Sequence, residues 1–163
     1  MTSATLLVLA FLLGCVSGLR SMTGPAVVCW GAQLGWLPLD QTSLAFLSYR
    51  FSLVVFTILA LGELIADKLP QIPNRTNPGP LAARAIFGAG CGAALCAAAQ
   101  APPLWGAIPG GLGGITGGFA GYFVRRWLTV TKYLPDLPVA LAEDLIAVGG
   151  GICIVSRFAL SLN

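Results

Sequence analysis

The sequence predicts an all-α protein, a polytopic integral membrane helical bundle with five or six transmembrane helices, one of them short or re-entrant. Of its 163 residues, 56% are hydrophobic and only 9% are charged, and the mean hydropathy is +0.85. Soluble domains carry about 25% charged residues, so this chain lacks the polar surface that a water-soluble fold needs. Apolar runs recur from one end to the other, and we expect residues 1–163 to form a single transmembrane domain.

Six apolar runs are separated by Gly, Pro and charged residues: Thr2–Leu19, Ala26–Leu37, Leu44–Ala66, Leu81–Ala99, Leu104–Val124 and Val139–Leu160. Five of them reach the roughly 17–25 residues that cross a hydrocarbon core of about 30 Å. The short second run lies between Gly24-Pro25 and Pro38, so we expect a half-helix, a re-entrant segment or a short full span there. No basic residue precedes the first run, which predicts an uncleaved helix rather than a signal peptide.

Basic residues predict the orientation, because short cytoplasmic loops are enriched in Lys and Arg. Two loop regions fall on one side with either five or six spans, and they hold Lys68, Arg75, Arg84, Arg125, Arg126 and Lys132. Six spans add Arg20 to this side and leave Arg50 and Arg157 opposite, which favours six. The predicted location is a membrane that the chain crosses several times, with the lipid bilayer as the main partner.

Four of the six carboxylates lie near the ends of apolar runs, where a charge costs roughly 2.5–3.5 kcal/mol to bury in lipid. Glu63 and Asp67 share one helix face because they are four residues apart. Glu143 and Asp144 enter from the same predicted side, so the two pairs are expected to meet at a similar depth. Together with two arginines on that side they form the candidate ligand-binding cluster: Glu63, Asp67, Glu143, Asp144, Arg20 and Arg84.

Two interpretations of this cluster remain open. The four acids are candidate ligands of a divalent cation, or members of a proton relay. Alternatively, the cluster is a structural ion-pair network, with Glu143 and Asp144 stabilised by the dipole of the helix that they open. Glu63 has the fewest structural explanations, because it lies one turn deeper than Asp67 and has no adjacent base in sequence.

Glycine forms a second signal, in two ladders with a spacing of four residues. Small residues at this spacing let the backbones of two membrane helices approach closely. We expect packing within the chain, with a homo-oligomer or a membrane-complex partner as the alternative use of this helix. The ladders are Gly106, Gly110, Gly114 and Gly118, and beside it Gly113, Gly117 and Gly121.

Several chemistries find no support in the sequence. The chain has no histidine, its five cysteines form no CxxC pair, and no serine lies in a nucleophile motif. Basic residues do not cluster with aromatic ones, so no nucleic acid partner is expected. No cofactor is evident, and a divalent cation is the one candidate.

Three segments resemble a known family. They are Gly62-Glu63-Leu64-Ile65-Ala66-Asp67-Lys68-Leu69-Pro70, Leu141-Ala142-Glu143-Asp144-Leu145 and Gly18-Leu19-Arg20-Ser21. The chain is similar, over most of its length, to the bacterial membrane-protein family called domain of unknown function 4126. This resemblance implies a fold type and a multi-pass location in the bacterial cytoplasmic (inner) membrane, and it implies no activity.

The function expected from the residues is a small transporter or channel-like protein that binds an ion or polar solute at the acidic and arginine cluster. The first alternative is a non-catalytic structural or accessory subunit of a membrane complex. The second is a metal-dependent lipid-phosphate enzyme, since acids and arginines serve phosphate chemistry with a divalent metal. An enzyme is less favoured than a non-catalytic protein.

Overall fold

A computed structural model of the chain describes residues 2–66 and 77–162, and within them it is all-helical, with six α-helices and no strand. The helices are α1 (Ser3–Leu19), α2 (Thr23–Gln33), α3 (Arg50–Ala66), α4 (Pro78–Ala98), α5 (Pro103–Arg126) and α6 (Asp136–Leu162). A short 3₁₀ turn, η1 (Ala45–Ser48), precedes α3, and one π-helical stretch, η2 (Trp127–Thr131), follows α5. The six predicted apolar runs therefore correspond to six helices.

Most of the helices extend beyond the apolar runs, for local chemical reasons. Pro78 and Pro103 are the first residues of α4 and α5, because the first turn needs no donor from their backbone nitrogen. α6 begins at Asp136, three residues before the apolar run that predicted it. The side chain of Thr2 caps α1 by accepting a hydrogen bond from the backbone N–H of Thr5. Hydropathy alone does not mark polar and proline residues of this kind as parts of a helix.

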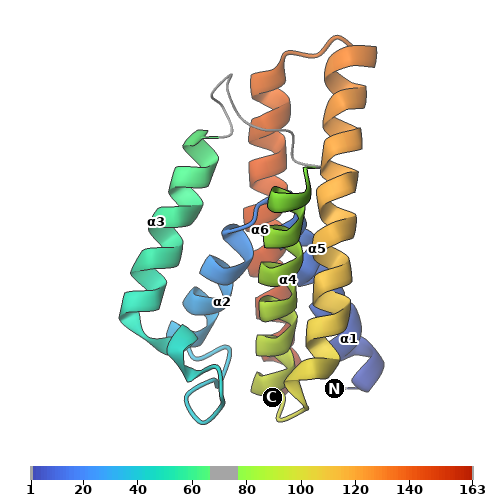
Figure 1. Cartoon of the computed structure of the whole chain (residues 1–163). Helices are drawn as coiled ribbons and strands as arrows, with labels where there is room; N and C mark the ends of the chain where they lie inside the picture. The colour runs from blue at the N-terminus through green and yellow to red at the C-terminus, as the bar shows by residue number, and fades with distance from the viewer. Residues whose placement is uncertain (1, 67–76, 163) are drawn as a thin grey trace.

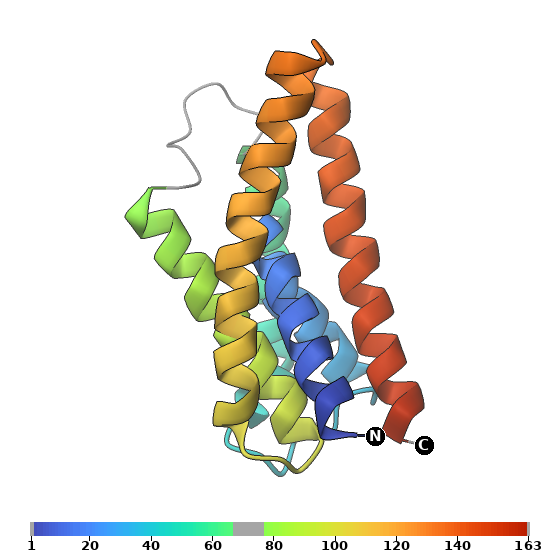
Figure 2. The same cartoon turned by 90° about the vertical axis from the view of Figure 1, so that its right-hand side faces the viewer.

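The helices run alternately along one axis, and both chain termini lie at the same end of the bundle (Figures 1 and 2). α2 has only 11 residues, or about 16 Å of helix, so the hairpin formed by α1 and α2 turns back inside the bundle. α5 and α6 continue past the level of this turn and are joined beyond it through η2. The α1–α2 turn is therefore surrounded by longer helices.

The first glycine ladder packs α5 directly against α4. A Cβ atom added at Gly106, Gly110 or Gly114 would collide with the backbone of Gly92, Gly88 or Arg84, respectively. Gly118, the last member, lies under the side chains of Arg84 and Leu81 at ordinary contact distance. The backbones of the two helices thus touch at three positions, each about one turn from the next, which no larger residue would permit.

The second ladder packs the neighbouring face of α5 against α1. A Cβ at Gly113 would meet the backbone of Phe11, and one at Gly117 would meet that of Cys15. Gly14 and Gly18 of α1 are the counterparts in this interface, since a Cβ on either would strike the backbone of α5. The last member, Gly121, is buried and lines a lateral cavity between α1, α5 and α6. Both ladders are therefore used for packing within this chain.

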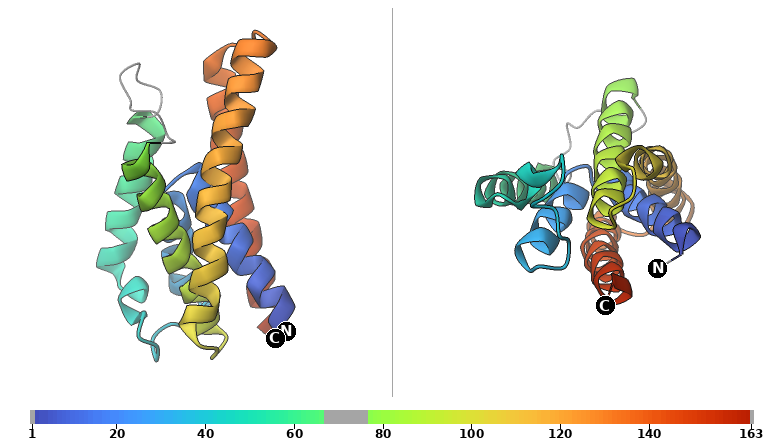
Figure 3. Two further views of the ribbon diagram at one scale, coloured as in Figure 1. Left: turned by 45° about the vertical axis from the view of Figure 1, so that its right-hand side comes forward. Right: turned by 90° about the horizontal axis from the view of Figure 1, so that it is seen from below.

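The outer helix α3 is attached more loosely than the others. α3 packs mainly on α2 and η1, and Phe56 of α3 meets Phe87 of α4 edge-on, with ring centroids 6.5 Å apart. Among the residues of α3 only Ser52 is buried. Figure 3 shows α3 at the margin of the bundle both from the side and from below. α2 lies between this outer helix and α6, against which it packs through Gly31.

Two helices, Pro78–Ala98 and Asp136–Ser161, are long and apolar enough to cross a membrane, a statement of length and composition only. α1 is apolar but shorter. Large apolar side chains are exposed on all six helices, for example Val8, Trp30, Ile58, Ile86, Leu112 and Leu145. The number of membrane-spanning helices, predicted as five or six, stays a prediction.

The glycine contacts predict opposite effects for two alanine substitutions in α4. Gly92→Ala is expected to destabilise the protein by about 1–3 kcal/mol, because the new methyl group strikes the backbone of Gly106. Gly90 has nothing within 4 Å of its added Cβ, so Gly90→Ala is expected to be neutral or to stabilise α4 by up to about 1 kcal/mol. Thermal unfolding in detergent, followed by far-UV circular dichroism, measures both, and equal effects would contradict the close-packed interface.

Candidate functional site

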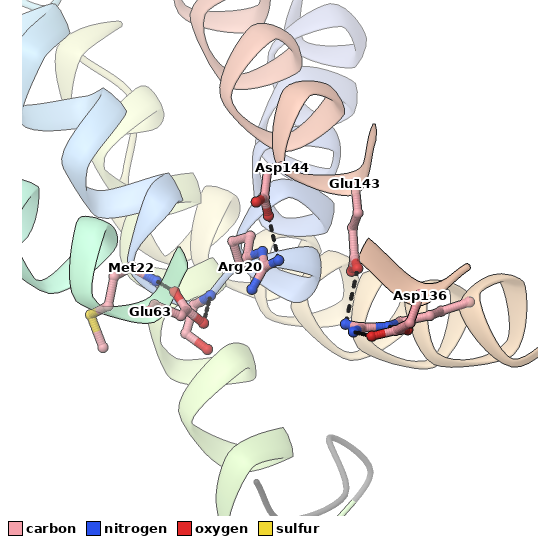
Figure 4. Close-up of polar contacts among 8 residues, drawn as sticks. Arg20, Met22, Glu63, Asp136, Glu143 and Asp144 are labelled. Carbon is pink, nitrogen blue, oxygen red and sulfur yellow. Dashed lines mark hydrogen bonds and ion pairs between the residues drawn. The ribbon is translucent and has the colours of Figure 1, made fainter. Parts of the chain in front are cut away.

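The candidate site surrounds the tight turn between α1 and α2, residues 20–22. Side chains from α3, α4 and α6 converge on this turn. Figure 4 shows the α3 and α6 side chains there, and beside them a second polar group at the end of α5. Here α1 ends with backbone carbonyls that lack an intrahelical donor, and α2 begins with N–H groups that lack an acceptor. The two helix ends therefore need opposite partners in one small volume.

Glu63 of α3 satisfies the beginning of α2. Its Oε1 accepts a hydrogen bond from the backbone N–H of Ser21, and its Oε2 accepts one from the N–H of Met22, both at 2.8 Å. A carboxylate is favourable at this position because the N-terminus of a helix carries a partial positive charge. Glu63 thus binds the turn with both oxygens and ties α3 to α2 (Figure 4).

Two buried arginines satisfy the other side of the turn. Arg20, whose side chain is 0% exposed, forms an ion pair with Asp144 of α6. Arg84 of α4, only 4% exposed, donates from Nη1 to the carbonyl oxygen of Gly18 at 2.9 Å. The end of α1 therefore receives a cation from α4, while its last arginine reaches across to an acid on α6.

Glu143 belongs to a different group, at the junction of α5 and α6. Arg125 donates from Nε to Oδ1 of Asp136 at 2.8 Å and from Nη2 to Oδ2 at 2.6 Å, a bidentate pair. The Nη1 of Arg125 lies 3.9 Å from Oε2 of Glu143. Glu143 is 9% exposed, whereas the side chain of Asp136 is 60% exposed. This second group closes the α5–α6 hairpin.

The predicted meeting of two acid pairs is seen only in part, because Glu63 and Asp144 lie around the same turn while Glu143 does not. Neighbouring residues on a helix point about 100° apart, so Asp144 faces Arg20 and Glu143 faces Arg125. The other predicted pair cannot be followed, because Asp67 lies outside the described residues. The structure therefore places Arg20, Arg84, Glu63 and Asp144 around one turn and puts Glu143 in the neighbouring group.

The helix-dipole explanation for Glu143 and Asp144 is wrong. α6 begins at Asp136, so these acids lie about 10–12 Å along the helix axis, beyond the first turn where the dipole acts. The apolar run begins only at Val139, so from the sequence alone these acids are expected nearer to the helix start. Their arginine partners stabilise them instead.

Sequence reasoning missed two kinds of participant. The backbone N–H groups of Ser21 and Met22 bear no side-chain signature, so nothing in the sequence marked them as partners of Glu63. Arg125 and Asp136 did carry a signal. Asp136 precedes Glu143 by two helical turns, which places both on one helix face, and Arg125 lies in the last turn of the preceding helix.

The described residues contain no group of three or more His, Cys, Asp or Glu side chains that could hold a metal ion. Of the four candidate metal ligands, Glu63, Glu143 and Asp144 instead face separate partners, and the fourth, Asp67, lies outside this part of the chain. The lateral cavity beside the second group, about 570 Å³ in volume, has mostly apolar walls, with Arg125 and Glu143 on its lining.

A family model described as Domain of unknown function (DUF4126) matches residues 7–157. The chain belongs to this family. The match runs from α1 into α6 and includes every described polar residue of the site, which confirms the resemblance based on the segments around Arg20, Glu63 and Glu143. No curated protein and no solved structure matches the chain. The DUF4126 description names no activity.

The double contact of Glu63 predicts a local effect in this DUF4126 protein. Glu63→Ala is expected to cost about 1–3 kcal/mol, because two N–H groups at the beginning of α2 lose their acceptor. Hydrogen exchange read by mass spectrometry should show faster exchange in the peptide that holds Ser21 and Met22. Ile65→Ala, on the same helix but at a side chain that is 68% exposed, is the control and should leave that peptide unchanged.

The two arginine pairs predict unequal effects. Asp144→Asn is expected to cost about 3–5 kcal/mol, because it leaves the charge of the fully buried Arg20 without this partner. Asp136→Asn should cost about 1 kcal/mol or less, because that carboxylate is mostly exposed. Detergent-solubilised protein unfolded by heat provides the comparison. Equal losses of stability in the two variants would contradict a larger contribution from the buried pair. So would a double variant, Arg20→Met with Asp144→Asn, that is no more stable than Asp144→Asn alone.

Proposed function

We propose that this protein is a small multi-pass membrane transporter or channel-like protein, and that the polar site at the α1–α2 turn binds a small anion. The membrane assignment is supported by the exposed apolar side chains of all six helices. Soluble monomers seldom expose contiguous apolar patches of more than a few hundred Å². The helices alternate in direction and both termini lie at one end, so the opposite end, which holds Arg125 and Arg126, is then cytoplasmic.

The proposed anion site is supported mainly by the position of the Glu63 carboxylate. Two adjacent backbone N–H groups at the N-terminus of α2 already hold a carboxylate, and that carboxylate comes from another helix. Helix ends that meet inside the membrane are used in this way by transporters, whose substrate anions bind at the N-termini of discontinuous helices. Glu63 thus occupies a position where two N–H donors and the positive end of the α2 dipole would also suit a free anion.

The charges around the turn favour exchange between Glu63 and such an anion. Two arginines, Arg20 and Arg84, face two acids, Glu63 and Asp144, so these four groups sum to zero. Withdrawal of Glu63 leaves one net positive charge beside two free N–H groups, which an entering anion restores to neutrality. Because α3 packs mainly on α2 and η1, it is the helix whose displacement disturbs the fewest contacts of the bundle.

A structural or accessory subunit is the second candidate, and a specific observation favours it. Each described acid near the turn already contacts a base or a backbone N–H. Such a network orders helices without any ligand. The metal-dependent enzyme has no comparable support among the described residues.

Anion flux tests the proposal. Purified protein in sealed vesicles should release chloride or phosphate when a potassium gradient with valinomycin sets a membrane potential. Glu63→Gln should raise the rate of anion release by about tenfold, because the neutral amide competes less well than the carboxylate with the anion for the N–H groups of Ser21 and Met22. The control is Asp136→Asn, which alters an exposed acid of the neighbouring group and should leave the rate unchanged.

Two results would contradict the transporter. One is the absence of flux in vesicles whose protein retains its helical circular dichroism. The other is a Glu63→Gln rate equal to that of the wild type. If the first result is joined by a stoichiometric second protein in native mass spectra of gently extracted membranes, the accessory subunit becomes the better conclusion.

A further inference from the structure

A second site, separate from the charged turn, lies in an apolar cavity between α2, α3 and α6. Its volume is about 390 Å³, within the roughly 300–1,000 Å³ that small-molecule pockets occupy. Its walls are mainly hydrophobic and include Ala26, Val27, Ala60, Leu61, Val148 and Ile152. The cavity exists because α3 stands away from α6 while both pack on α2.

Thr23, the first residue of α2, stands out on this wall. It lines the cavity and is only 3% exposed, and its Oγ1 has no hydrogen-bond partner in the described part of the chain. Buried hydroxyl groups almost always have a hydrogen-bond partner, because a buried hydroxyl without a hydrogen bond destabilises the folded state. A group that enters the cavity can supply the missing partner.

The opposite side of the cavity is open to the surroundings. Trp30, Leu34 and Leu61 line it and are each about half exposed, at 48%, 55% and 54%. The indole Nε1 of Trp30 donates to Oγ1 of Thr57 at 3.2 Å, which joins α2 to α3 beside this mouth. In a bilayer, the mouth admits molecules from the lipid phase rather than from water.

We infer that this cavity binds a membrane-soluble aliphatic alcohol, with its chain against Val27, Leu61 and Ile152 and its single hydroxyl on Thr23. A hydroxyl suits this wall because it can both donate to and accept from a threonine, and because the rest of the lining offers almost only apolar surface. The site uses none of the charged groups of the anion proposal, so it stands or falls independently of anion flux.

Quenching of tryptophan fluorescence by brominated probes tests the site. Trp30 and Trp36 line the cavity, so Trp105→Phe and Trp127→Phe are introduced first to leave only these two reporters. The probes are ω-bromononanol and bromononane, compared at equal mole fraction in the detergent micelle. Thr23→Val should raise the half-quenching mole fraction of the alcohol about 3- to 10-fold and leave that of the bromoalkane unchanged. Thr23→Ser, which keeps the hydroxyl, should behave like the parent protein.

A second pair of variants tests the place of binding. Ala60→Phe fills the cavity and should abolish saturable quenching by both probes, whereas Leu59→Phe, at a neighbouring side chain outside the lining, should preserve it. The inference is overturned if Thr23→Val affects the alcohol and the alkane equally, which would make the occupant a plain acyl chain. It is also overturned if quenching persists unchanged in Ala60→Phe.

Discussion

The close approach of α5 to α1 and α4 is the constraint on which the rest of the structure depends. The helices touch backbone to backbone, through Gly106, Gly110 and Gly114 on one face of α5 and Gly113 and Gly117 on the next. Such contacts leave almost no freedom to slide, because a shift of one residue would bring a larger side chain against a backbone. The three helices form a rigid unit against which α2, α3 and α6 are placed.

This rigid unit also positions the charges. The backbone of Arg84 rests on Gly114, and its guanidinium reaches the carbonyl of Gly18, which itself packs on Gly114 and Gly117. Arg20 follows two residues later and meets Asp144 of α6. A packing motif without chemistry of its own thus brings two arginines to the α1–α2 turn, where Glu63 completes a neutral set.

The polar turn and the apolar cavity meet at the beginning of α2. Met22 donates its N–H to Glu63, and Thr23, the next residue, lines the cavity. α2 is short, and α3 is held to it by Glu63 and by the bond between Trp30 and Thr57. Movement of α3 would therefore alter the polar turn and the apolar cavity together.

The sequence by itself determined the helical class and the six apolar elements, because these follow from local composition and from spacings of three to four residues. The glycine spacing marked two packing faces but left open whether they pack within the chain or against a partner. It also indicated that Glu63 was unusual. The family resemblance rested on the same local segments, and the family model confirmed it.

Only the tertiary structure decided which groups meet. Glu143 and Asp144 are adjacent in sequence yet serve different arginines, because consecutive helix positions face different neighbours. The position of α3 relative to α2 decides which group accepts from the N–H groups of Ser21 and Met22. It also forms the cavity that Thr23 lines with a hydroxyl that has no hydrogen-bond partner among the described residues. Such contacts join residues some forty positions apart, and a local pattern carries no information about them.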